Sequence, residues 1–507
     1  MIHCVCVRVR SRRYVLTTKD VDFLTETVRA YNSTLNRTVL RCLVDSYEYV
    51  TTHIGVGAHG ILRMQTGDWN DVFVQEAMNG GSTRAEVIAS GESSTNAAMA
   101  AAVLPRFAEL IELAAEMTGD DQYRNLTAGV RQFAKSQAVA LKKHAWNGAW
   151  LNRAWIPLPN NASSGAEEQF PGGWAGTNGV DDRLCLEPQP WAIIASTQSQ
   201  RGSSKPGGSD SAAVLDAAQT ATLIESLSSK LSSPLGSTVL SKPFARTAIS
   251  AQAETSGGSA SRSRSGDAAD AGQHENGGVW ASQNHPLVLA LASVNATAAL
   301  EEWLRNTRAT QAQLYPTFWP GVWSGADVVT SHLSTDGQAG TQSWPAMPVL
   351  CTHPHSWPVY SAARLAGLTF DGGGMTIAPA VPMAAGGYRY STRVASVQRI
   401  HHHQQGRIEY TGRYEPVRAV GECVVLLDLT VAHPELLALS AVEASPITAT
   451  VRVSIEGKAA TATGAAPHEV QVVGGGLELH TRGLVCGPGA ALVFSVEFAL
   501  AQLGTNQ

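Results

Sequence analysis

The segment HGILRMQTGDWNDVFV holds two carboxylates beside an indole, a combination that can carry out acid chemistry. Asp68 and Asp71 flank Trp69 and Asn70 in a loop that follows a glycine-punctuated turn. An apolar ring beside a carboxyl group disfavours the charged form and raises its pKa, which a general acid needs at neutral pH. The same four residues could form an Asx turn that caps a helix, so spacing alone leaves both interpretations open.

Composition indicates that these residues belong to a large globular protein. The chain has 507 residues, 44% of them hydrophobic, with 37 basic and 42 acidic side chains and a net charge of −5. This balance offers no basic field to a nucleic-acid backbone, and we find no apolar run long enough to span a bilayer. We therefore expect neither nucleic acid nor a membrane as a partner. The 12 tryptophans suit stacking on sugar rings, although tryptophan also packs cores.

The cysteines, the histidines and the first residues bear on location and metals. The 7 cysteines lack paired C-x-x-C spacing, which argues against a zinc site and a disulfide framework. The opening MIHCVCVRVRSRR places its charges after a short apolar stretch, the reverse of a signal peptide, so a cytoplasmic location is expected. The run His401–His403, even with His353 and His355, has no carboxylate or cysteine at ligand spacing, so no metal is predicted.

The elements that must position the acidic loop are helical over most of the chain. From Thr18 to about Gly367 apolar residues recur at helical spacing, and Pro105 should kink the clearest helix or mark its start. Long helices joined by loops that carry aromatic and acidic residues fit an α/α toroid, although bundles show the same periodicity. Helices are predicted over residues 20–31, 36–53, 96–117, 120–143, 212–231, 286–306 and 349–366.

The pattern changes near residue 385. From Tyr388 onward apolar residues alternate with a period of two between turn signals, which predicts an antiparallel β-sandwich. We therefore predict a mainly α protein with a β domain: a helical domain over 1–384 and a β-sandwich over 385–507. Two segments rich in Ser and Gly, 197–211 and 256–272, have too few apolar groups to pack and are predicted to be disordered insertions.

Several segments, in the same order, resemble glycoside hydrolase family 94, the inverting cellobiose and chitobiose phosphorylases. GDWND looks like the catalytic-loop signature of that family, and LEPQPWAII resembles a strand-like segment of it. The resemblance covers about residues 15–370 and implies an (α/α)6 barrel, incomplete at its N-terminus, followed by a β-sandwich. The similar segments are residues 67–71, 91–110, 144–155, 186–194, 232–244 and 275–280.

The resemblance also implies roles for individual residues. Asp71 matches the general acid, which protonates the glycosidic oxygen as the bond breaks, and Trp69 matches an indole in the sugar site. Each tryptophan could equally pack the barrel, because a Trp in a loop at the end of a helix is often structural. The candidates for substrate binding are Asp68, Trp69, Trp150, Arg153, Gln189 and Trp191.

The phosphate site is where this sequence departs from the family pattern. The phosphate-contacting His of the family corresponds to Ser282 in ENGGVWASQNHP, and His285 follows three residues later. The T-G-x-x-G-W turn reads THPHSW here, keeping Thr352 and replacing the first Gly with His353. Thr352, His353 and His285 are therefore the candidate phosphate ligands.

Hydrolysis would need a further carboxylate. An inverting phosphorylase uses one protein carboxyl group because phosphate attacks the anomeric carbon, whereas an inverting hydrolase needs a second one to activate water. Asp327 and Glu275 are the candidate bases for that case, although Asp327 could simply be a turn residue after Gly325.

Three functions remain open. The first is an inverting phosphorylase that cleaves a β-linked gluco-oligosaccharide with inorganic phosphate and needs no cofactor. The second is an inverting β-glucoside hydrolase or transglycosylase, and the third is a non-catalytic glycan-binding subunit. The third is considered because only 66 residues precede Gly67 and none holds the R-D-x-x-Q-D sugar-binding motif of the family, so we expect an N-terminally truncated member. Family resemblance further implies a homodimer.

Overall fold

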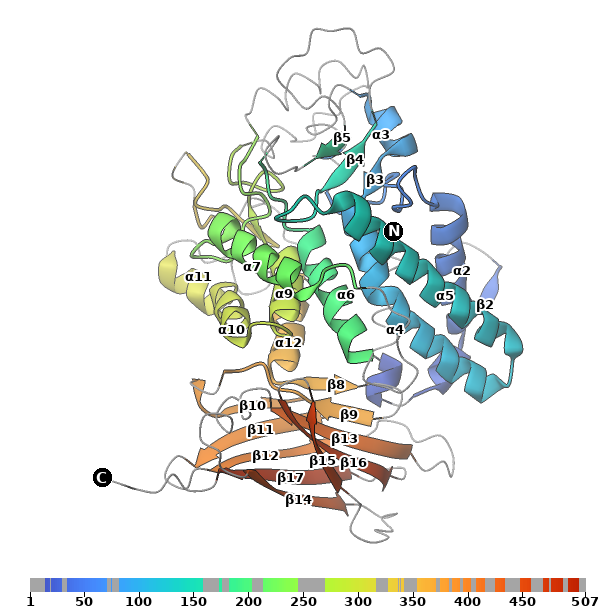
Figure 1. Ribbon diagram of the computed structural model, residues 1–507, viewed down its shortest axis with the longest axis vertical. Helices are drawn as coiled ribbons and strands as arrows, with labels where there is room; N and C mark the ends of the chain where they lie inside the picture. Colours follow the sequence, from blue (N-terminus) through green and yellow to red (C-terminus); the bar gives the residue numbers. More distant parts are fainter. Residues whose placement is uncertain are drawn as a thin grey trace.

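The computed structural model combines a layer of helices with two five-stranded sheets that lie below it in Figure 1. Among the described residues, no helix is long and apolar enough to cross a membrane. The structure describes residues 14–18, 20–29, 34–70, 74, 82–157, 173–175, 182–202, 213–244, 270–315, 327–335, 337, 339–341, 353–370, 374–382, 385–392, 395–402, 407–414, 425–433, 447–456, 468–473, 476–486 and 491–500.

The described helices all lie within the first 370 residues. They are α2 (Val39–Glu48), α3 (Arg84–Ser90), α4 (Ser94–Thr118), α5 (Asp121–Ala140), α6 (Pro188–Gly202), α7 (Ala217–Leu231), α9 (Ala281–Leu291), α10 (Ala296–Arg305), α11 (Arg308–Leu314) and α12 (His353–Leu365). A 3-10 turn, η1 (Asp22–Leu24), and two π-helical turns, η2 (Tyr49–Ile54) and η4 (Leu141–Ala145), complete the set.

The described strands begin with five short ones among the helices. These are β1 (Thr27–Arg29), β2 (Asn36–Thr38), β3 (Glu92–Ser93), β4 (Ala154–Ile156) and β5 (Gly173–Ala175). The remaining strands are β6 (Val279–Trp280), β7 (Val328–Val329), β8 (Leu368–Phe370), β9 (Gly374–Ile377), β10 (Tyr388–Ser391), β11 (Ala395–His402), β12 (Arg407–Tyr414), β13 (Val425–His433), β14 (Ile447–Glu456), β15 (His468–Val473), β16 (Gly476–Cys486) and β17 (Ala491–Leu500).

The long helices form where the sequence supplies both an apolar stripe and a cap. The α4 helix begins after Ser93, whose side chain accepts from the Asn96 amide, and α5 begins after Asp120, which accepts from the Gln122 amide. These caps satisfy backbone donors that a helix leaves free at its first turn. Pro105 lies inside α4, which continues on both sides of it. Helix α4 packs between α5 and α6, and its apolar face is buried in the helical core.

Two predicted helices and one predicted strand-like segment differ from the observed elements. In the segment predicted as a helix over 20–31, residues 22–24 form η1 and residues 27–29 form strand β1, which pairs with β2. Residues 286–306 are divided between α9 and α10, because Asn295 caps a new helix by accepting from the Ala298 amide. The segment resembling a strand, 186–194, is wrong as a strand: it opens α6 at Pro188, where a fixed φ and a missing N–H suit a first helical turn.

The two large sheets contain every described strand after β7. One has the order β10-β11-β12-β17-β14 and is antiparallel throughout, whereas the other has the order β15-β16-β13-β9-β8 and includes a parallel pair between β13 and β9. Phe370 of one sheet packs on Tyr414 of the other, with ring centroids 5.3 Å apart. Strands β8 and β9 precede residue 385. This sheet therefore includes residues that lie before the predicted start of the β domain.

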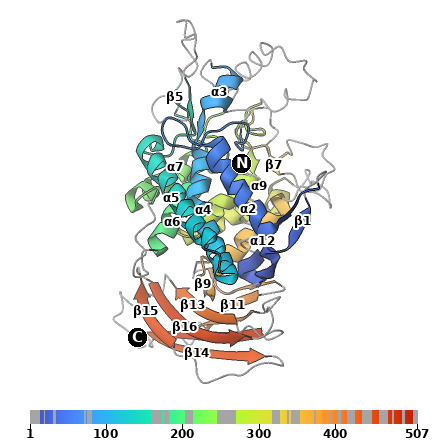
Figure 2. The same cartoon turned by 90° about the vertical axis from the view of Figure 1, so that its right-hand side faces the viewer.

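Figure 1 and Figure 2 both show the helices above the two large sheets. Polar contacts join the sheets to the chain above them. Tyr414 on β12 donates to the carbonyl of Thr17 at 2.9 Å, and Tyr388 on β10 donates to the carbonyl of Ala366 at 2.9 Å. Arg399 on β11 is buried and donates to the carbonyls of Val381, Pro382 and Gly386. The segment between α12 and β10 is thus fixed to the sheet.

A small sheet of order β3-β4-β5 lies at the opposite end of the helical layer from the large sheets (Figure 1). A further two-stranded sheet pairs β6 with β7. In the first, Glu92, Trp155 and Trp174 are register partners on one face, whereas Ser93, Ala154 and Ala175 share the other. This second face points toward the loop that carries Asp68, because Ser93 contacts that carboxylate.

Candidate functional site

Asp68 is buried at the base of the GDWND loop and is held from three sides. Arg153, directly before β4, donates to both carboxylate oxygens, with Nη1 3.1 Å from Oδ2. Ser93 Oγ donates to Oδ2, and the amide of Asn70 donates to Oδ1 at 3.0 Å. Burial alone would raise the pKa of Asp68, but the Arg153 charge and these hydrogen bonds lower it below its ordinary value. Asp68 is therefore a charged structural anchor.

Glu187 is a second carboxyl group on the same guanidinium. Its Oε2 lies 3.5 Å from Arg153 Nε, and its Oε1 accepts from Asn70 Nδ2 at 3.1 Å. The residue is fully buried just before α6, and burial raises its pKa, an effect that Arg153 and the hydrogen bonds only partly offset. Burial alone would lower the pKa of Arg153, but Asp68 and Glu187 raise it, so Arg153 stays charged.

Four segments that are distant in the sequence meet at this point. Asp68 comes from GDWND, Ser93 from GES, Arg153 from HAWNGAWLNRAW and Glu187 from LEPQPWAII. Gln189 adds a further link between the last two segments: its Oε1 accepts from the Leu151 amide at 3.0 Å, and its Nε2 donates to the Leu151 and Cys185 carbonyls. Gln189 therefore holds α6 against the loop before Arg153.

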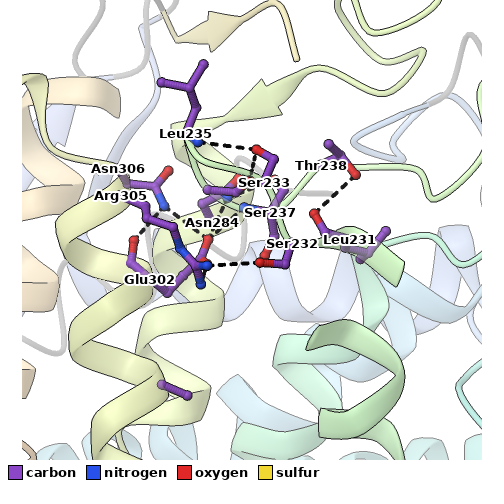
Figure 3. A network of polar contacts seen from close by, with 12 residues as sticks. Leu231, Ser232, Ser233, Leu235, Ser237, Thr238, Asn284, Glu302, Arg305 and Asn306 are labelled. Carbon is purple, nitrogen blue, oxygen red and sulfur yellow. Dashed lines mark hydrogen bonds and ion pairs between the residues drawn. The ribbon is translucent and has the colours of Figure 1, made fainter. Parts of the chain in front are cut away.

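The chain before Glu187 is fixed by a neighbouring loop. The Leu186 amide donates to the carbonyl of Val239 at 3.0 Å. Figure 3 shows how helix α10 holds the loop before Val239: Glu302 Oε1 accepts from the Ser237 amide at 2.8 Å and Arg305 donates to Ser232. Asn284 and Asn306 also donate to Glu302 Oε1. This network fixes the loop that ends at Val239, and Val239 in turn holds Leu186, the residue before Glu187.

The predicted indoles have different environments. Trp69 is half-buried and makes an edge-to-face contact with Trp280, with centroids 5.0 Å apart. Trp150 is 1% exposed and packs in the helical core, so neither face of its ring is open to a sugar in this structure. Trp191 is half-buried against the same core. Of the three, Trp69 is the one next to the acidic loop.

Asp71, the predicted general acid, lies outside the described residues. Asn70 and Val74 are described on either side of it, and the Val74 amide donates to the carbonyl of Asn70 at 3.2 Å. Asn70 is itself held by Asp68 and Glu187. The structure thus describes the residue that precedes Asp71 and the contacts that fix it.

His285 and Asp327 lie together, but away from Trp69. Both line a small hollow with an empty volume, mouth included, of about 270 Å³, and Arg308 lines it too. Val279 and Val329 of the β6–β7 pair face this hollow, whereas their neighbours Trp280 and Val328 pack with Trp69. Because successive strand residues point to opposite faces, the β6–β7 pair separates the hollow from the Asp68 site.

The imidazole of His285 is held neutral. It is 1% exposed, its Nδ1 lies 2.8 Å from Ser361 Oγ, and burial together with the Arg308 charge lowers its pKa to about 3. A neutral ring adds no cation for phosphate. Of the other candidates, Thr352 lies outside the described residues, and His353 is described only as the first residue of α12.

The remaining candidate base, Glu275, is half-buried in the turn before β6. Its neighbour Asn276 fixes this turn by exchanging hydrogen bonds with the amide and carbonyl of Phe244. Within the described part of the chain, no group of three or more His, Cys, Asp or Glu side chains is placed to hold a metal ion.

Glu187, Ser93 and Asn70 have no predicted role, although each lies in a segment that resembles the family. They join the predicted Asp68 and Arg153 in one cluster. No motif spacing pointed to Glu187, because its partner Arg153 is distant in the sequence.

Comparisons with known proteins agree with the motifs. No curated protein matches the chain at a significant level. A solved structure titled "Sialidase" is 10% identical with a TM-score of 0.42; the match covers 81% of this chain, which spans 29% of that one. Residues 4–206 match the family model described as "Glycosyl hydrolase 94 superfamily, catalytic domain". Over these residues the chain is similar to the catalytic domain of the glycosyl hydrolase 94 superfamily.

Proposed function

We propose that the protein is an inverting glycoside phosphorylase that cleaves a β-linked gluco-oligosaccharide with inorganic phosphate and releases a sugar 1-phosphate. The observation that carries this proposal is the meeting of the four motif segments on the Asp68–Arg153 ion pair at the base of the GDWND loop. The match to the glycosyl hydrolase 94 superfamily supports a carbohydrate-active enzyme of the phosphorylase or hydrolase type. Inorganic phosphate is the co-substrate, and no metal or organic cofactor is invoked.

In the proposed reaction Asp71 is the acid. A phosphate oxygen attacks the anomeric carbon from the face opposite the leaving group, the bond from that carbon to the glycosidic oxygen breaks, and the Asp71 proton moves to the leaving oxygen. Trp69 offers an apolar face to the sugar ring. Thr352 and His353 are proposed as phosphate ligands, whereas the neutral state of His285 and its place behind β6–β7 count against a direct role for it.

The charges of the site favour an uncharged sugar. Arg153 is fully buried and is paired with Asp68 and Glu187, so its positive charge is already compensated. A sugar carboxylate would find no spare cation at this cluster, and burying an unpaired charge is costly. We therefore propose neutral β-glucosides or N-acetylglucosaminides as substrates.

We also propose an architecture that follows the superfamily: an (α/α) barrel-like domain in residues 1–384 and a β-sandwich in residues 385–507, with β8 and β9 supplied to the sandwich by the first segment. The packing of α4 between α5 and α6, and the contact between Phe370 and Tyr414, support this division.

The test follows sugar 1-phosphate and free sugar from a panel of β-linked disaccharides, with and without inorganic phosphate. The wild type should release sugar 1-phosphate only with phosphate, and Asp71→Asn should reduce the rate by about 10²–10⁴-fold, the usual contribution of a general acid. Asp121→Asn, an exposed carboxyl on α5, is the matched control and should retain activity.

Other products would select the other functions. Free sugar released without phosphate would identify a hydrolase, with Asp327 or Glu275 as the base to be tested. Disaccharide binding that survives in Asp71→Asn, with no product from the wild type, would identify a glycan-binding subunit and reject the phosphorylase.

A further inference from the structure

We propose that Glu187 is a positioning residue for the acid of this site: it fixes the side chain of Asn70, the residue directly before Asp71. The proposal rests on the function proposed above. Glu187 acts through Asn70 and need not contact the sugar.

The contacts around Asn70 support this role. Its amide donates to Asp68 Oδ1 at 3.0 Å and its side chain Nδ2 donates to Glu187 Oε1 at 3.1 Å, so two carboxyl groups hold one residue. Its carbonyl accepts from the Val74 amide at 3.2 Å. Because its amide, side chain and carbonyl are all hydrogen-bonded, Asn70 has little conformational freedom. Asp71 is the residue that follows it in the sequence.

The charge balance of the cluster requires Glu187 to be neutral. Arg153 donates from both of its terminal nitrogens to Asp68. Glu187 Oε2 lies 3.5 Å from Arg153 Nε and has no hydrogen-bond partner among the described residues. Two ionised carboxylates on one buried guanidinium would leave a net negative charge inside the protein, which is costly. The raised pKa of Glu187 agrees with this assignment, as Asp68 keeps the charge.

Ionisation of Glu187 would therefore disturb the loop. A charged Glu187 would compete with Asp68 for Arg153 and so weaken the clamp on the Asn70 amide. The described titratable groups near it are Asp68 on the GDWND loop, Arg153 before β4 and Cys185 before α6. Of these, Arg153 alone is positive, so no other described cation can take its place.

The test compares three variants over a range of pH. Glu187→Gln imitates the neutral acid and keeps the acceptor for Asn70, whereas Glu187→Ala removes it. Glu92→Gln is the matched control, because Glu92 is equally buried but is held by His59 on the other face of the β3-β4-β5 sheet. The readouts are kcat and KM for phosphorolysis of the active disaccharide, together with the melting temperature.

We expect Glu187→Ala to lower kcat by about 100-fold with little change in KM, because a misplaced acid affects the chemical step more than sugar binding. Glu187→Gln should restore most of kcat near neutral pH and move the alkaline limb of the kcat profile to higher pH. An alkaline limb that stays where it is in the wild type, or equal losses in Gln and Ala, would overturn the proposal. Glu92→Gln should leave the limb in place.

A readout without turnover separates this proposal from the proposed function. If the wild type releases no product at all, the phosphorylase is rejected, and the melting temperature still tests Glu187. The wild type should lose stability relative to Glu187→Gln as the pH rises, because the burial penalty appears when the carboxyl ionises. Parallel melting curves of the two proteins at all pH values would reject a neutral Glu187.

Discussion

At the scale of single residues, the site depends on one buried cation with two carboxyl partners. Arg153 is 1% exposed, so removing its charge leaves Asp68 buried and unpaired. Arg153→Met should lower the free energy of unfolding by about 3–5 kcal/mol, the usual cost of breaking a buried pair. Urea unfolding measures this change. Arg131→Met, which breaks an exposed pair with Glu112, should cost less than about 1 kcal/mol, and equal losses would contradict the interpretation.

The neutral imidazole of His285 leads to a prediction about acid stability. Its pKa in the folded protein is about 3, against 6.5 for a free histidine. The unfolded chain therefore binds a proton below about pH 6.5 that the folded protein binds only near pH 3. The contribution of this group to the free energy of unfolding is complete above pH 6.5. It falls by up to about 1.4 kcal/mol per pH unit as the pH is lowered from 6.5 toward 3.

The variant His285→Gln should remove this slope. Free energies of unfolding measured by urea between about pH 4 and 7 should depend less on pH in the variant than in the wild type. The same slope in both proteins would show that the imidazole is protonated in the folded state.

Residues that belong to short sequence motifs could be predicted from the sequence, whereas contacts between residues far apart in the chain could not. GDWND and its neighbouring motifs marked Asp68 and Arg153 as candidates for substrate binding, because the residue types at short spacing match a known pattern. That role stays a prediction, and the structure shows the two side chains paired with each other. Their ion pair joins residues far apart in the chain, so its partners and the role of Glu187 required the fold. Trp150 shows the converse, since a motif residue can be fully buried in packing.

At the scale of elements, the loop before Val239 needs a glycine. Gly236 has a φ of +114°, and a Cβ there would lie 2.5 Å from Asn306 Nδ2 and 2.8 Å from Asn284 Nδ2. Both amides belong to the Glu302 network of Figure 3. Gly236→Ala should cost about 1–3 kcal/mol, since it adds strain and displaces these side chains.

Thermal unfolding measures this cost against a matched substitution. Gly129→Ala lies on the exposed face of α5 with nothing within 4 Å, and it should stabilise the protein by about 0.5–1 kcal/mol. If Gly236→Ala also raised the melting temperature, the close packing of this loop on α10 would be refuted.

The elements that were predictable are those with long, regular patterns. Helices α4 and α5 and the strands after β10 follow their apolar periods, which local sequence supplies. The helix expected over 286–306 is divided because one cap, Asn295, outweighs a continuous apolar stripe. Within residues 20–29, the pairing of β1 with β2 takes the place of the predicted helix, and this pairing depends on residues outside the helical pattern.

At the scale of the whole molecule, a few buried groups connect the sheets to the helices. Arg399 donates hydrogen bonds to three carbonyls in the segment between α12 and β10. Arg399→Met would leave these half-buried acceptors without that donor, at up to about 1–3 kcal/mol each. Calorimetry should show a lower melting temperature than for Arg389→Met, an exposed arginine on the adjacent strand. Equal melting temperatures would show that Arg399 does not hold this junction.

The parallel pairing of β9 with β13 has a consequence for protein synthesis. Strand β9 leaves the ribosome about fifty residues before its partner, a delay of about 3–10 s at ordinary elongation rates. During this interval the nascent chain already carries its helices, while β8 and β9 form at most a two-stranded hairpin with an unpaired edge. The interval before β13 emerges is therefore when the nascent chain is most prone to aggregate and most in need of a chaperone.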